Sequence, residues 1–274
     1  MKHPIIALIT DFGADDFFIA SMKGVIFHIN LSARIIDITH QVPSFDIMRG
    51  GFILFSCYGY FPPKTIFLVI IDPGVGSSRK ILLGETKNYF FIAPDNGILS
   101  LVLESEEVQQ IREVTNNKFF LKEQSKTFEG RDKMAPVAAW LSKGISPSEF
   151  GPRVRNFKKL RDLKPLWSKK GITGSIIYRD KFGNLITNIP AIMVNQLREK
   201  TGKNKLTLVV EKREITSFRE NYSLGERGEL FFLVGSLGLV EIAAKEASAS
   251  EKMKAKVGDK VIIKNEKSEK SEKR

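Results

Sequence analysis

The sequence is poor in cysteine, in histidine and in long apolar runs, and each scarcity excludes a class of protein. The one cysteine, Cys57, cannot form an intramolecular disulfide, and its apolar neighbours predict a buried thiol without a chemical role. The three histidines show no paired metal-ligand spacing, so we expect no metal site. No apolar run reaches the roughly 18 residues of a membrane span, and the first residues do not resemble a signal peptide. We therefore expect a cytoplasmic protein without a membrane segment.

The composition is that of a globular protein with unevenly distributed charge. Of the 274 residues, 42% are hydrophobic and 27% are charged, which fits one or two folded domains. The net charge is +12, but the stretch from Arg153 to Lys170 holds eight basic residues and one acid. Its only aromatic residues are Phe157 and Trp167, too few for the interleaved stacking of a nucleic-acid site. A solvated linker is therefore favoured, and no nucleic-acid partner is expected.

The first half of the chain alternates strand-like and helix-like patterns. Short runs rich in β-branched residues indicate buried strands, and the amphipathic stretches between them indicate helices. This alternation predicts an α/β domain with a mainly parallel sheet, which we assign to residues 1–152. The predicted strands are Ile5–Thr10, Ala33–Thr39, Thr65–Ile71 and Tyr89–Ala93, and the predicted helices are Asp16–Ile29, Ser44–Tyr58 and Met134–Lys143.

After a basic linker, residues 153–170, the pattern changes to short strands separated by Gly and Asn turns. Crossover helices are scarce, which predicts a small all-β antiparallel barrel over residues 171–264. The low-complexity end, residues 265–274, predicts a disordered tail. The predicted strands are Gly174–Tyr178, Leu185–Ile189, Leu206–Lys212, Leu230–Val234, Val240–Ala243 and Val261–Lys264, with one helix over Ala191–Lys200.

Acidic turns follow three of the predicted strands of the first domain. They begin at Asp11, Asp72 and Asp95. The carboxyl ends of parallel strands share one edge of a sheet, so these side chains should converge there, where ligands bind in α/β proteins.

Other motifs are compatible with more than one role. The run DPGVGSSRK, starting at Asp72, matches neither common phosphate-binding pattern, and its leading aspartate would repel phosphate. The run FEGRD, residues 128–132, is compatible with a capped helix start. The run FGN, residues 182–184, is compatible with either a hairpin turn or a ligand-facing aromatic ring and amide.

Together these motifs resemble one family, the S-adenosyl-L-methionine (SAM) hydroxide adenosyltransferases, whose superfamily includes the halogenating fluorinase and chlorinase. The match runs in order from about Ile5 to Ala247. The resemblance implies an N-terminal α/β domain, a C-terminal β-barrel, and a homotrimer with active sites between the N-domain of one subunit and the C-domain of the next. The motifs are ITDFG (9–13), KG (23–24), IDITH (36–40), FDI (45–47), DPGVGSSR (72–79), APDNG (93–97), FEGRD (128–132), APVAA (135–139) and DKFGNLITN (180–188).

The reaction that the resemblance implies is attack of water or hydroxide on the ribose 5′ carbon of SAM, which releases methionine and adenosine. SAM is then the substrate, and no cofactor is expected. The implied substrate contacts are Asp11 to the ribose hydroxyls, Asp16 and Asp180 to the methionine ammonium, Phe182 and Asn184 to adenine, Ser236 to the methionine end, and Phe45 as an apolar or aromatic wall.

The implied catalytic group is Asp72, Arg79 and Glu129, and it contains one departure from the family. Asp72 and Arg79 match the family residues, but Glu129 stands where the family has histidine. A carboxylate can accept a proton, so Glu129 is a candidate general base. An ionised Glu in place of a neutral His would also change the charge of the trio from zero to −1, which opposes bound hydroxide.

Two other functions stay open. A non-catalytic adenosine- or SAM-binding protein would explain the loss of the histidine. Halide-dependent adenosyl transfer is disfavoured, because the carboxylate of Asp72 would repel a halide ion.

Overall fold

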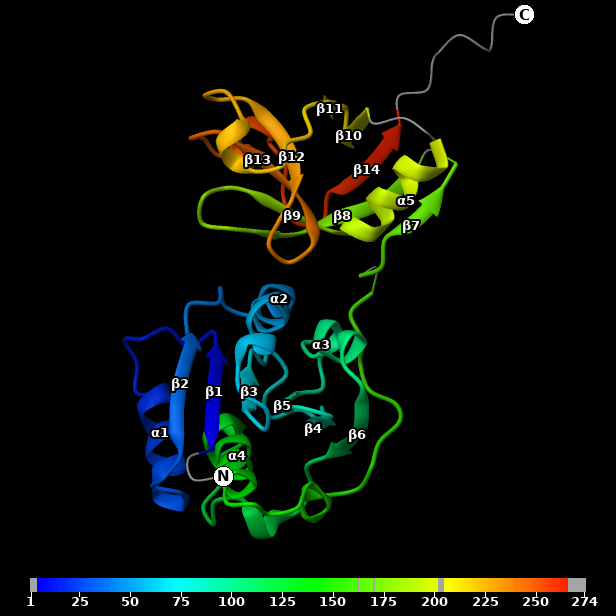
Figure 1. Ribbon diagram of the computed structural model, residues 1–274. Coiled ribbons are helices and arrows are strands. Elements are labelled where there is room, and N and C mark those ends of the chain that lie inside the picture. Colours follow the sequence, from blue (N-terminus) through cyan, green and yellow to red (C-terminus); the bar gives the residue numbers. More distant parts are fainter. Residues whose placement is uncertain (1–3, 162, 170, 202–204, 266–274) are drawn as a thin grey trace, which may run out of the picture. The chain divides into compact units, whose positions relative to one another are not determined.

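Strand β1 (Ile5–Thr10) is apolar on both faces, and the structure, a computed structural model, buries it inside a six-stranded sheet (Figure 1). The strand order is β2-β1-β3-β5-β4-β6, and β2 (Arg34–Thr39), β1, β3 (Ile66–Ile70) and β5 (Phe90–Pro94) run parallel. Strand β4 (Ile81–Thr86) is antiparallel to both β5 and β6 (Val108–Glu113). The prediction of a mainly parallel sheet is confirmed.

Helices cover both faces of this sheet. α1 (Phe18–Ile29) and α4 (Ala135–Ser142) pack on the face that contains Ile6 and Leu8, and α2 (Ile47–Cys57) and α3 (Ser100–Ser105) pack on the face that contains Ala7 and Ile9. Successive side chains of a strand point to opposite faces, so a strand covered on both sides is apolar throughout. The shorter helices of the chain are η1 (Tyr58–Tyr60), η2 (Asn117–Phe119), the π-helix η3 (Gly130–Met134), η4 (Pro147–Phe150) and η5 (Tyr222–Leu224).

The second sheet is antiparallel and nearly closes into a barrel, as predicted. Its strand order is β11-β10-β14-β8-β9-β13-β12, with β7 paired to β8. A bridge between Phe218, which follows β11, and Phe232 in β12 brings the two edges of the sheet together. The elements are β7 (Leu166–Ser168), β8 (Gly171–Arg179), β9 (Leu185–Pro190), α5 (Ala191–Thr201), β10 (Leu206–Val210), β11 (Arg213–Ile215), β12 (Leu230–Val234), β13 (Leu239–Ala244), α6 (Ala249–Met253) and β14 (Lys260–Asn265).

The structure describes residues 4–161, 163–169, 171–201 and 205–265, and the chain divides into two units, Met1–Arg161 and Asp162–Arg274. Of the predicted tail, 265–274, only Asn265 lies within the described residues, and it ends β14. None of the helices among the described residues has the length and apolar character needed to cross a bilayer.

The first part of the predicted basic linker is hydrogen bonded to the first unit. Val154 donates its N–H to the carbonyl oxygen of Ile111 in β6 at 2.8 Å. Further along, Leu160 donates its N–H to the hydroxyl oxygen of Ser100 at 2.8 Å. The chain therefore leaves the first unit only after it has lain along the sheet edge and the start of α3.

Two helix glycines give a test of the packing between α2 and the turn before α3. A Cβ on Gly51 would lie 2.7 Å from the backbone oxygen of Ile98, whereas one on Gly24 in α1 would meet nothing within 4 Å. We expect Gly51→Ala to lower the free energy of unfolding by about 1–3 kcal/mol, because the added carbon overpacks the core. Gly24→Ala, the matched control, should raise it by about 0.5–1 kcal/mol. Urea unfolding measures both, and equal responses would contradict the packing described.

Candidate active site

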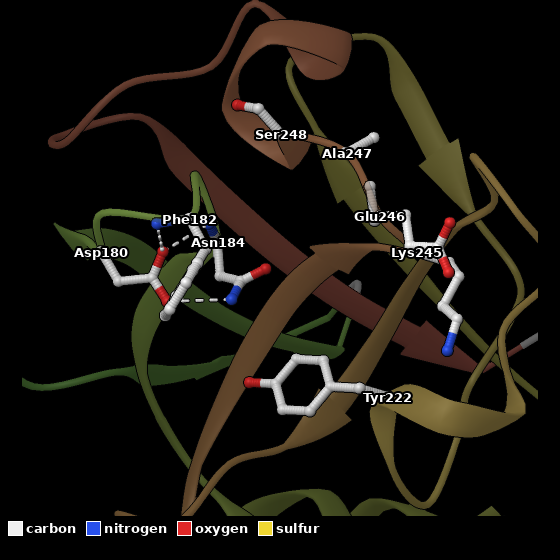
Figure 2. Close-up of a pocket in the computed structure, with 9 residues that line it drawn as sticks. Asp180, Phe182, Asn184, Tyr222, Lys245, Glu246, Ala247 and Ser248 are labelled. Carbon is white, nitrogen blue, oxygen red and sulfur yellow. Dashed lines mark hydrogen bonds between the residues drawn. The ribbon is translucent and has the colours of Figure 1, made fainter.

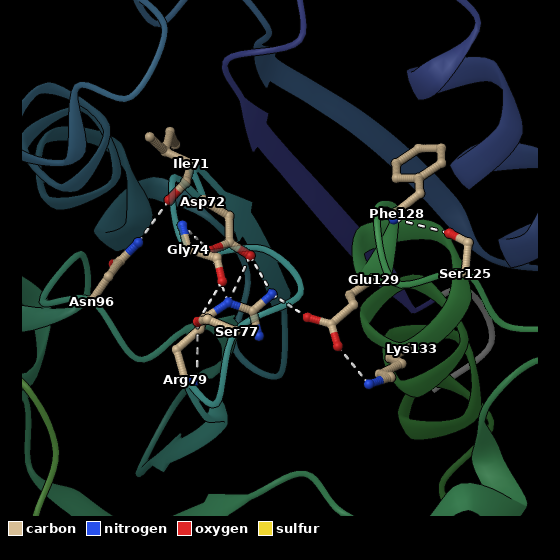
Figure 3. A network of polar contacts seen from close by, with 10 residues as sticks. All are labelled: Ile71, Asp72, Gly74, Ser77, Arg79, Asn96, Ser125, Phe128, Glu129 and Lys133. Carbon is tan, nitrogen blue, oxygen red and sulfur yellow. Dashed lines mark hydrogen bonds and ion pairs between the residues drawn. The ribbon is translucent and has the colours of Figure 1, made fainter.

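Three side chains predicted to be catalytic, Asp72, Arg79 and Glu129, lie in direct contact in the first unit (Figure 3). Arg79 Nε donates to both carboxylate oxygens of Asp72, each at 2.8 Å, and Nη2 donates to Asp72 Oδ2 and to Glu129 Oε2. The exposed fractions of the side chains are 6% for Arg79, 5% for Asp72 and 9% for Glu129. One guanidinium therefore joins two carboxylates where water has little access.

The turn after β3 places Asp72 and Arg79 together. Asp72 Oδ1 accepts the backbone N–H of Gly74 at 3.2 Å, which closes the turn around the carboxylate. From the turn after β5, Asn96 donates Nδ2 to the carbonyl oxygen of Ile71 at 2.7 Å. The backbone before Asp72 is thus held by the neighbouring turn, and Arg79 returns to the same carboxylate.

The π-helix η3 brings Glu129 to this turn, and a proline lies just after it, in the first turn of α4. Pro136 has no N–H to donate to the carbonyl oxygen of Asp132, and that oxygen accepts the N–H of Leu121 instead, at 2.9 Å. The π form is rare and often occurs at functional sites. A Cβ on Gly130 would lie 3.1 Å from a side chain of β3, so the absence of a side chain lets η3 approach the strand. Glu129, immediately before Gly130, therefore reaches Arg79.

A fourth charged residue, Lys133, completes the group, and the sequence interpretation missed it. Lys133 Nζ donates to Glu129 Oε1 at 2.5 Å, on the carboxylate oxygen that Arg79 does not use (Figure 3). The spacing from Glu129 to Lys133 is i,i+4, the orientation that favours a pair on a helix, and this signal was readable in the sequence. The trio alone carries a formal charge of −1, as predicted from its residue types, and with Lys133 included two acids and two bases give zero.

Both cations act on the ionisation of Glu129. Burial alone would raise the pKa of Glu129, but hydrogen bonds and charge attraction from Lys133 and Arg79 lower it below its usual value. Burial likewise would lower the pKa of Arg79, and the contacts with Asp72 and Glu129 raise it. An ionised Glu129 with both oxygens engaged by cations is a weak base, which favours an electrostatic role over proton abstraction.

Asp11 and Phe45 lie in contact at the edge of the first sheet where the parallel strands end. Asp11 follows β1, and its Oδ2 accepts the backbone N–H of Phe45 at 2.8 Å. β1 and β3 are parallel neighbours with Thr10 opposite Ile70, so Asp11 and Asp72 follow adjacent strand ends at one edge of the sheet. Burial raises the pKa of Asp11, and the negative charge of Asp72 contributes. Phe45 has φ +68°, a left-handed value that is strained for a residue with a side chain, and 66% of it is exposed. Asp16 is exposed in the bend before α1 and takes part in none of the hydrogen bonds described above.

The third predicted acidic turn has a structural role. Asp95 is buried, and its Oδ1 accepts the backbone N–H of Lys158 at 2.7 Å. The convergence of Asp11 and Asp72 at the sheet edge is therefore as expected, whereas the carboxylate of Asp95 holds the returning chain.

The FGN run of the second unit forms a turn around Asp180 (Figure 2). Asp180 Oδ1 accepts the N–H groups of Phe182 and Asn184 at 2.9 and 2.8 Å, and Oδ2 accepts Asn184 Nδ2 at 2.9 Å. Gly183 has φ +87°, and a Cβ there would lie 2.2 Å from Ser248 Oγ, so only glycine fits. Both oxygens of Asp180 thus orient the loop. Phe182 is left 68% exposed, and the amide of Asn184 is nearly buried.

This loop borders a cavity of about 690 Å³ in the second unit (Figure 2). An exposed aromatic ring beside amide, hydroxyl and backbone groups suits a flat ligand with several hydrogen-bonding atoms. The sequence interpretation missed the far wall, because nothing in the run AKEAS marks it as ligand-facing. The lining residues are Asp180, Phe182, Asn184, Tyr222, Ala244, Lys245, Glu246, Ala247 and Ser248.

Tyr222 connects the cavity to a buried acid. Its hydroxyl donates to Glu241 Oε2 at 2.5 Å, and Glu241 is 7% exposed. Burial raises the pKa of Glu241, with a contribution from the charge of Asp180, and burial and Glu241 together raise the pKa of Tyr222. Ser236 is exposed in the turn between β12 and β13 and is not among the lining residues of the cavity.

The predicted site residues thus fall into two groups, one in each unit. Asp11, Asp72, Arg79 and Glu129 belong to the first unit, and the cavity with Phe182 and Asn184 belongs to the second. Among the described residues, no group of three or more His, Cys, Asp or Glu side chains is arranged to hold a metal ion.

Both units match one protein family. Residues 6–151 match the SAM hydroxide adenosyltransferase N-terminal domain, and residues 174–262 match the C-terminal domain of the same family. The chain therefore belongs to the SAM hydroxide adenosyltransferase family.

Its relatives include two kinds of enzyme. The (R)-S-adenosyl-L-methionine hydrolase of Methanocaldococcus jannaschii is 31% identical, over 94% of this chain and 95% of the relative. The enzyme of the same name from Salinispora arenicola is 31% identical over 95% and 97%. The fluorinase of an Actinoplanes species is 28% identical but covers 68% of this chain and 72% of its own. Among solved structures, an uncharacterized conserved protein from Thermotoga maritima has a TM-score of 0.86 and 36% identity, over 95% of this chain and all of the other.

The ionisation of Glu129 predicts how stability depends on pH. Because the folded-state pKa lies below the usual value of 4.5, the stability that ionised Glu129 contributes is present above that pH and is lost as the pH falls through the folded pKa. Glu129→Gln should lower the free energy of unfolding at pH 7 and flatten its decline below pH 4.5, by at most about 1.4 kcal/mol per pH unit. Denaturant unfolding at several pH values measures the slope, and an unchanged slope would contradict a lowered pKa.

Proposed function

We propose that the protein hydrolyses S-adenosyl-L-methionine to adenosine and L-methionine. The observation that carries the proposal is the buried contact of Asp72, Arg79 and Glu129 at the ligand-binding edge of an α/β sheet, in a chain whose relatives include SAM hydrolases. The protein is then an enzyme that transfers an adenosyl group to water and needs no cofactor.

The proposed hydrolysis of SAM requires mainly a water molecule that is positioned as the nucleophile. The water oxygen bonds to the ribose 5′ carbon, the C–S bond breaks with its electron pair going to sulfur, and one proton of the water is released. The sulfonium loses its positive charge in this step, so a carboxylate next to sulfur would stabilise the substrate more than the transition state. Acids in the site should therefore contact the ribose, the ammonium or the water.

In this proposal, Asp72 and Arg79 hold the attacking water. Asp72 accepts a hydrogen bond from it, and Arg79 supplies the fixed positive charge that stabilises developing hydroxide. At about 4 Å and an effective dielectric near 20, one such charge attracts hydroxide by roughly 4 kcal/mol, and the carboxylates of Asp72 and Glu129 offset part of that attraction. Nε and Nη2 of Arg79 are engaged by Asp72 and Glu129, which fixes the plane of the guanidinium. Alignment of water with the C–S bond contributes further.

The remaining residues are proposed to bind the substrate. Asp11, oriented by the N–H of Phe45, accepts hydrogen bonds from the ribose hydroxyls. Phe182 stacks on adenine, and Asn184 hydrogen-bonds its edge from the wall of the cavity. Asp180 orients that loop, and its charge contributes to attraction of the ammonium. Asp16 and Ser236 are assigned to the methionine end, and Phe45 to an aromatic wall.

We further propose a homotrimer in which each site combines the first unit of one subunit with the second unit of the next. The two sets of site residues lie in separate units of one chain, which is compatible with sharing between copies. A cytoplasmic location is part of the proposal, because SAM is an intracellular metabolite.

Two alternatives are separated by one assay. A non-catalytic SAM-binding protein would leave SAM intact, and a halogenase would form 5′-halo-adenosine. Purified protein is incubated with SAM, with and without chloride, and the products are separated by chromatography. Adenosine and methionine in equal amounts, independent of chloride, are the expected products. Intact SAM with measurable binding would favour the binding protein and refute the hydrolase.

Asp72→Asn should abolish turnover while adenosine binding stays within about tenfold of wild type, since the change removes the charge that orients the water and not the nucleoside contacts. The matched control is Glu107→Gln, the same change at an exposed position before β6, which should keep wild-type turnover. Thermal melting of each variant shows whether it is folded. Unchanged turnover in folded Asp72→Asn would remove Asp72 from the reaction.

Shared sites predict complementation between two inactive variants. Asp72→Asn changes the first unit, and Asn184→Ala changes the second. In a trimer assembled at random from equal amounts, about one quarter of the sites combine an intact first unit with an intact second unit of the next copy. Coexpression should therefore restore about a quarter of wild-type activity. Sites contained within single chains would give no recovery.

A further inference from the structure

Lys133 takes no part in the chemistry proposed above, yet it contacts Glu129 of the proposed catalytic group. We propose that Lys133 is a positioning residue of the hydrolytic site, which neutralises Glu129 so that this carboxylate holds Arg79 without making the site negative. The inference rests on the proposed function. Glu129 and Lys133 are then one functional pair.

Glu129 links Lys133 to the guanidinium of Arg79 through its two carboxylate oxygens. Lys133 Nζ contacts Glu129 Oε1, and Glu129 Oε2 contacts Arg79 Nη2, so the carboxylate lies between two cations. Asp72 contacts Nε and Nη2 of the same guanidinium, so the two carboxylates share Nη2. A shift of Glu129 would therefore release one of the two carboxylates that fix the orientation of Arg79.

The pair differs from an ordinary surface ion pair on a helix. Exposed pairs contribute little because water and salt screen them. Here the Glu129 side chain is 9% exposed and Lys133 is 26% exposed, so the acid lies inside and the base covers it from the solvent side. The Lys133 ammonium also lies 5.8 Å from the ring centre of Phe120, which limits its freedom on that side. A buried carboxylate that loses one of its cations is strongly penalised.

The charge balance explains why the reaction would need the lysine. With Lys133, the four side chains sum to zero. Without it, the group carries one negative charge, which attracts the cationic sulfonium of SAM and repels hydroxide. That change stabilises the ground state and destabilises the transition state, so it should lower kcat without raising KM. A purely structural lysine would not produce this split.

The experiment is a double-mutant cycle on the full-length protein. The variants are Lys133→Met, Glu129→Gln, the two combined, and Lys133→Arg, with Lys143→Met as control because it removes the same charge at the far end of α4, where Lys143 is exposed. For each variant, kcat and KM for SAM are measured, SAM binding is measured by calorimetry, and thermal melting shows that it is folded.

We expect Lys133→Met to lower kcat about tenfold or more, with KM for SAM unchanged or lower. The double variant, in which Asp72 and Arg79 remain as a neutral pair, should be more active than Lys133→Met alone. The kcat of Lys133→Arg should stay within about threefold of wild type, and the kcat of Lys143→Met should equal that of wild type. A normal kcat in Lys133→Met, or a double variant no better than the single one, would overturn the proposal.

The binding measurements separate this inference from the proposed function. If wild-type protein leaves SAM intact, the hydrolase assignment fails, and binding still decides the role of Lys133. Tighter SAM binding by Lys133→Met and weaker binding by Glu129→Gln would support the charge balance. Equal SAM affinity in all variants would overturn it.

Discussion

A buried guanidinium must be paired, and two segments of the first unit supply the partners of Arg79. Removal of one partner from a buried ion pair costs about 3–5 kcal/mol, because the remaining charge stays out of water. Arg79 meets this constraint with two carboxylates that come from distant parts of the chain, Asp72 from the turn after β3 and Glu129 from the turn before η3. The parallel sheet supplies the first partner, and the π-helix supplies the second.

The position of Glu129 depends on backbone features that take no part in the proposed reaction. Pro136 leaves the carbonyl oxygen of Asp132 free to bind Leu121, and Gly130 lets η3 approach β3. The side chain of Asp132 is fully buried and accepts the backbone N–H of Ser125 at 2.6 Å, which fixes the loop before η3. In the FEGRD motif, residues 128–132, some residues therefore serve to position the carboxylate of Glu129.

The elements that could be predicted are those whose environment the sequence encodes locally. β1, β3 and β5 are covered on both faces and are therefore continuously apolar, so their runs were readable. β6 was missed because only two of its six residues, VQQIRE, are apolar and it lies at the edge of the sheet, and β4 was missed although it is mostly buried. Turns after parallel strands predicted that Asp11 and Asp72 lie at one edge, since the pairing of β1 with β3 alone brings them there.

What could not be predicted depends on packing between distant segments. Asp95 has the same local sequence signature as Asp72, but the returning chain at Lys158 occupies its carboxylate. Tyr222 reaches the cavity of the second unit from η5, with no motif around it. The contact of Glu129 with Lys133 could be predicted from helical spacing. The contact of the other Glu129 oxygen with Arg79 could not, because it joins segments 50 residues apart.

The central claim is that a water molecule held by Asp72 and Arg79 attacks the ribose 5′ carbon. Hydrolysis of SAM in water enriched in ¹⁸O, followed by mass spectrometry of the products, tests it most directly. The account predicts one ¹⁸O atom in the 5′ hydroxyl of adenosine and none in methionine. Unlabelled adenosine, or label in methionine instead, would contradict it.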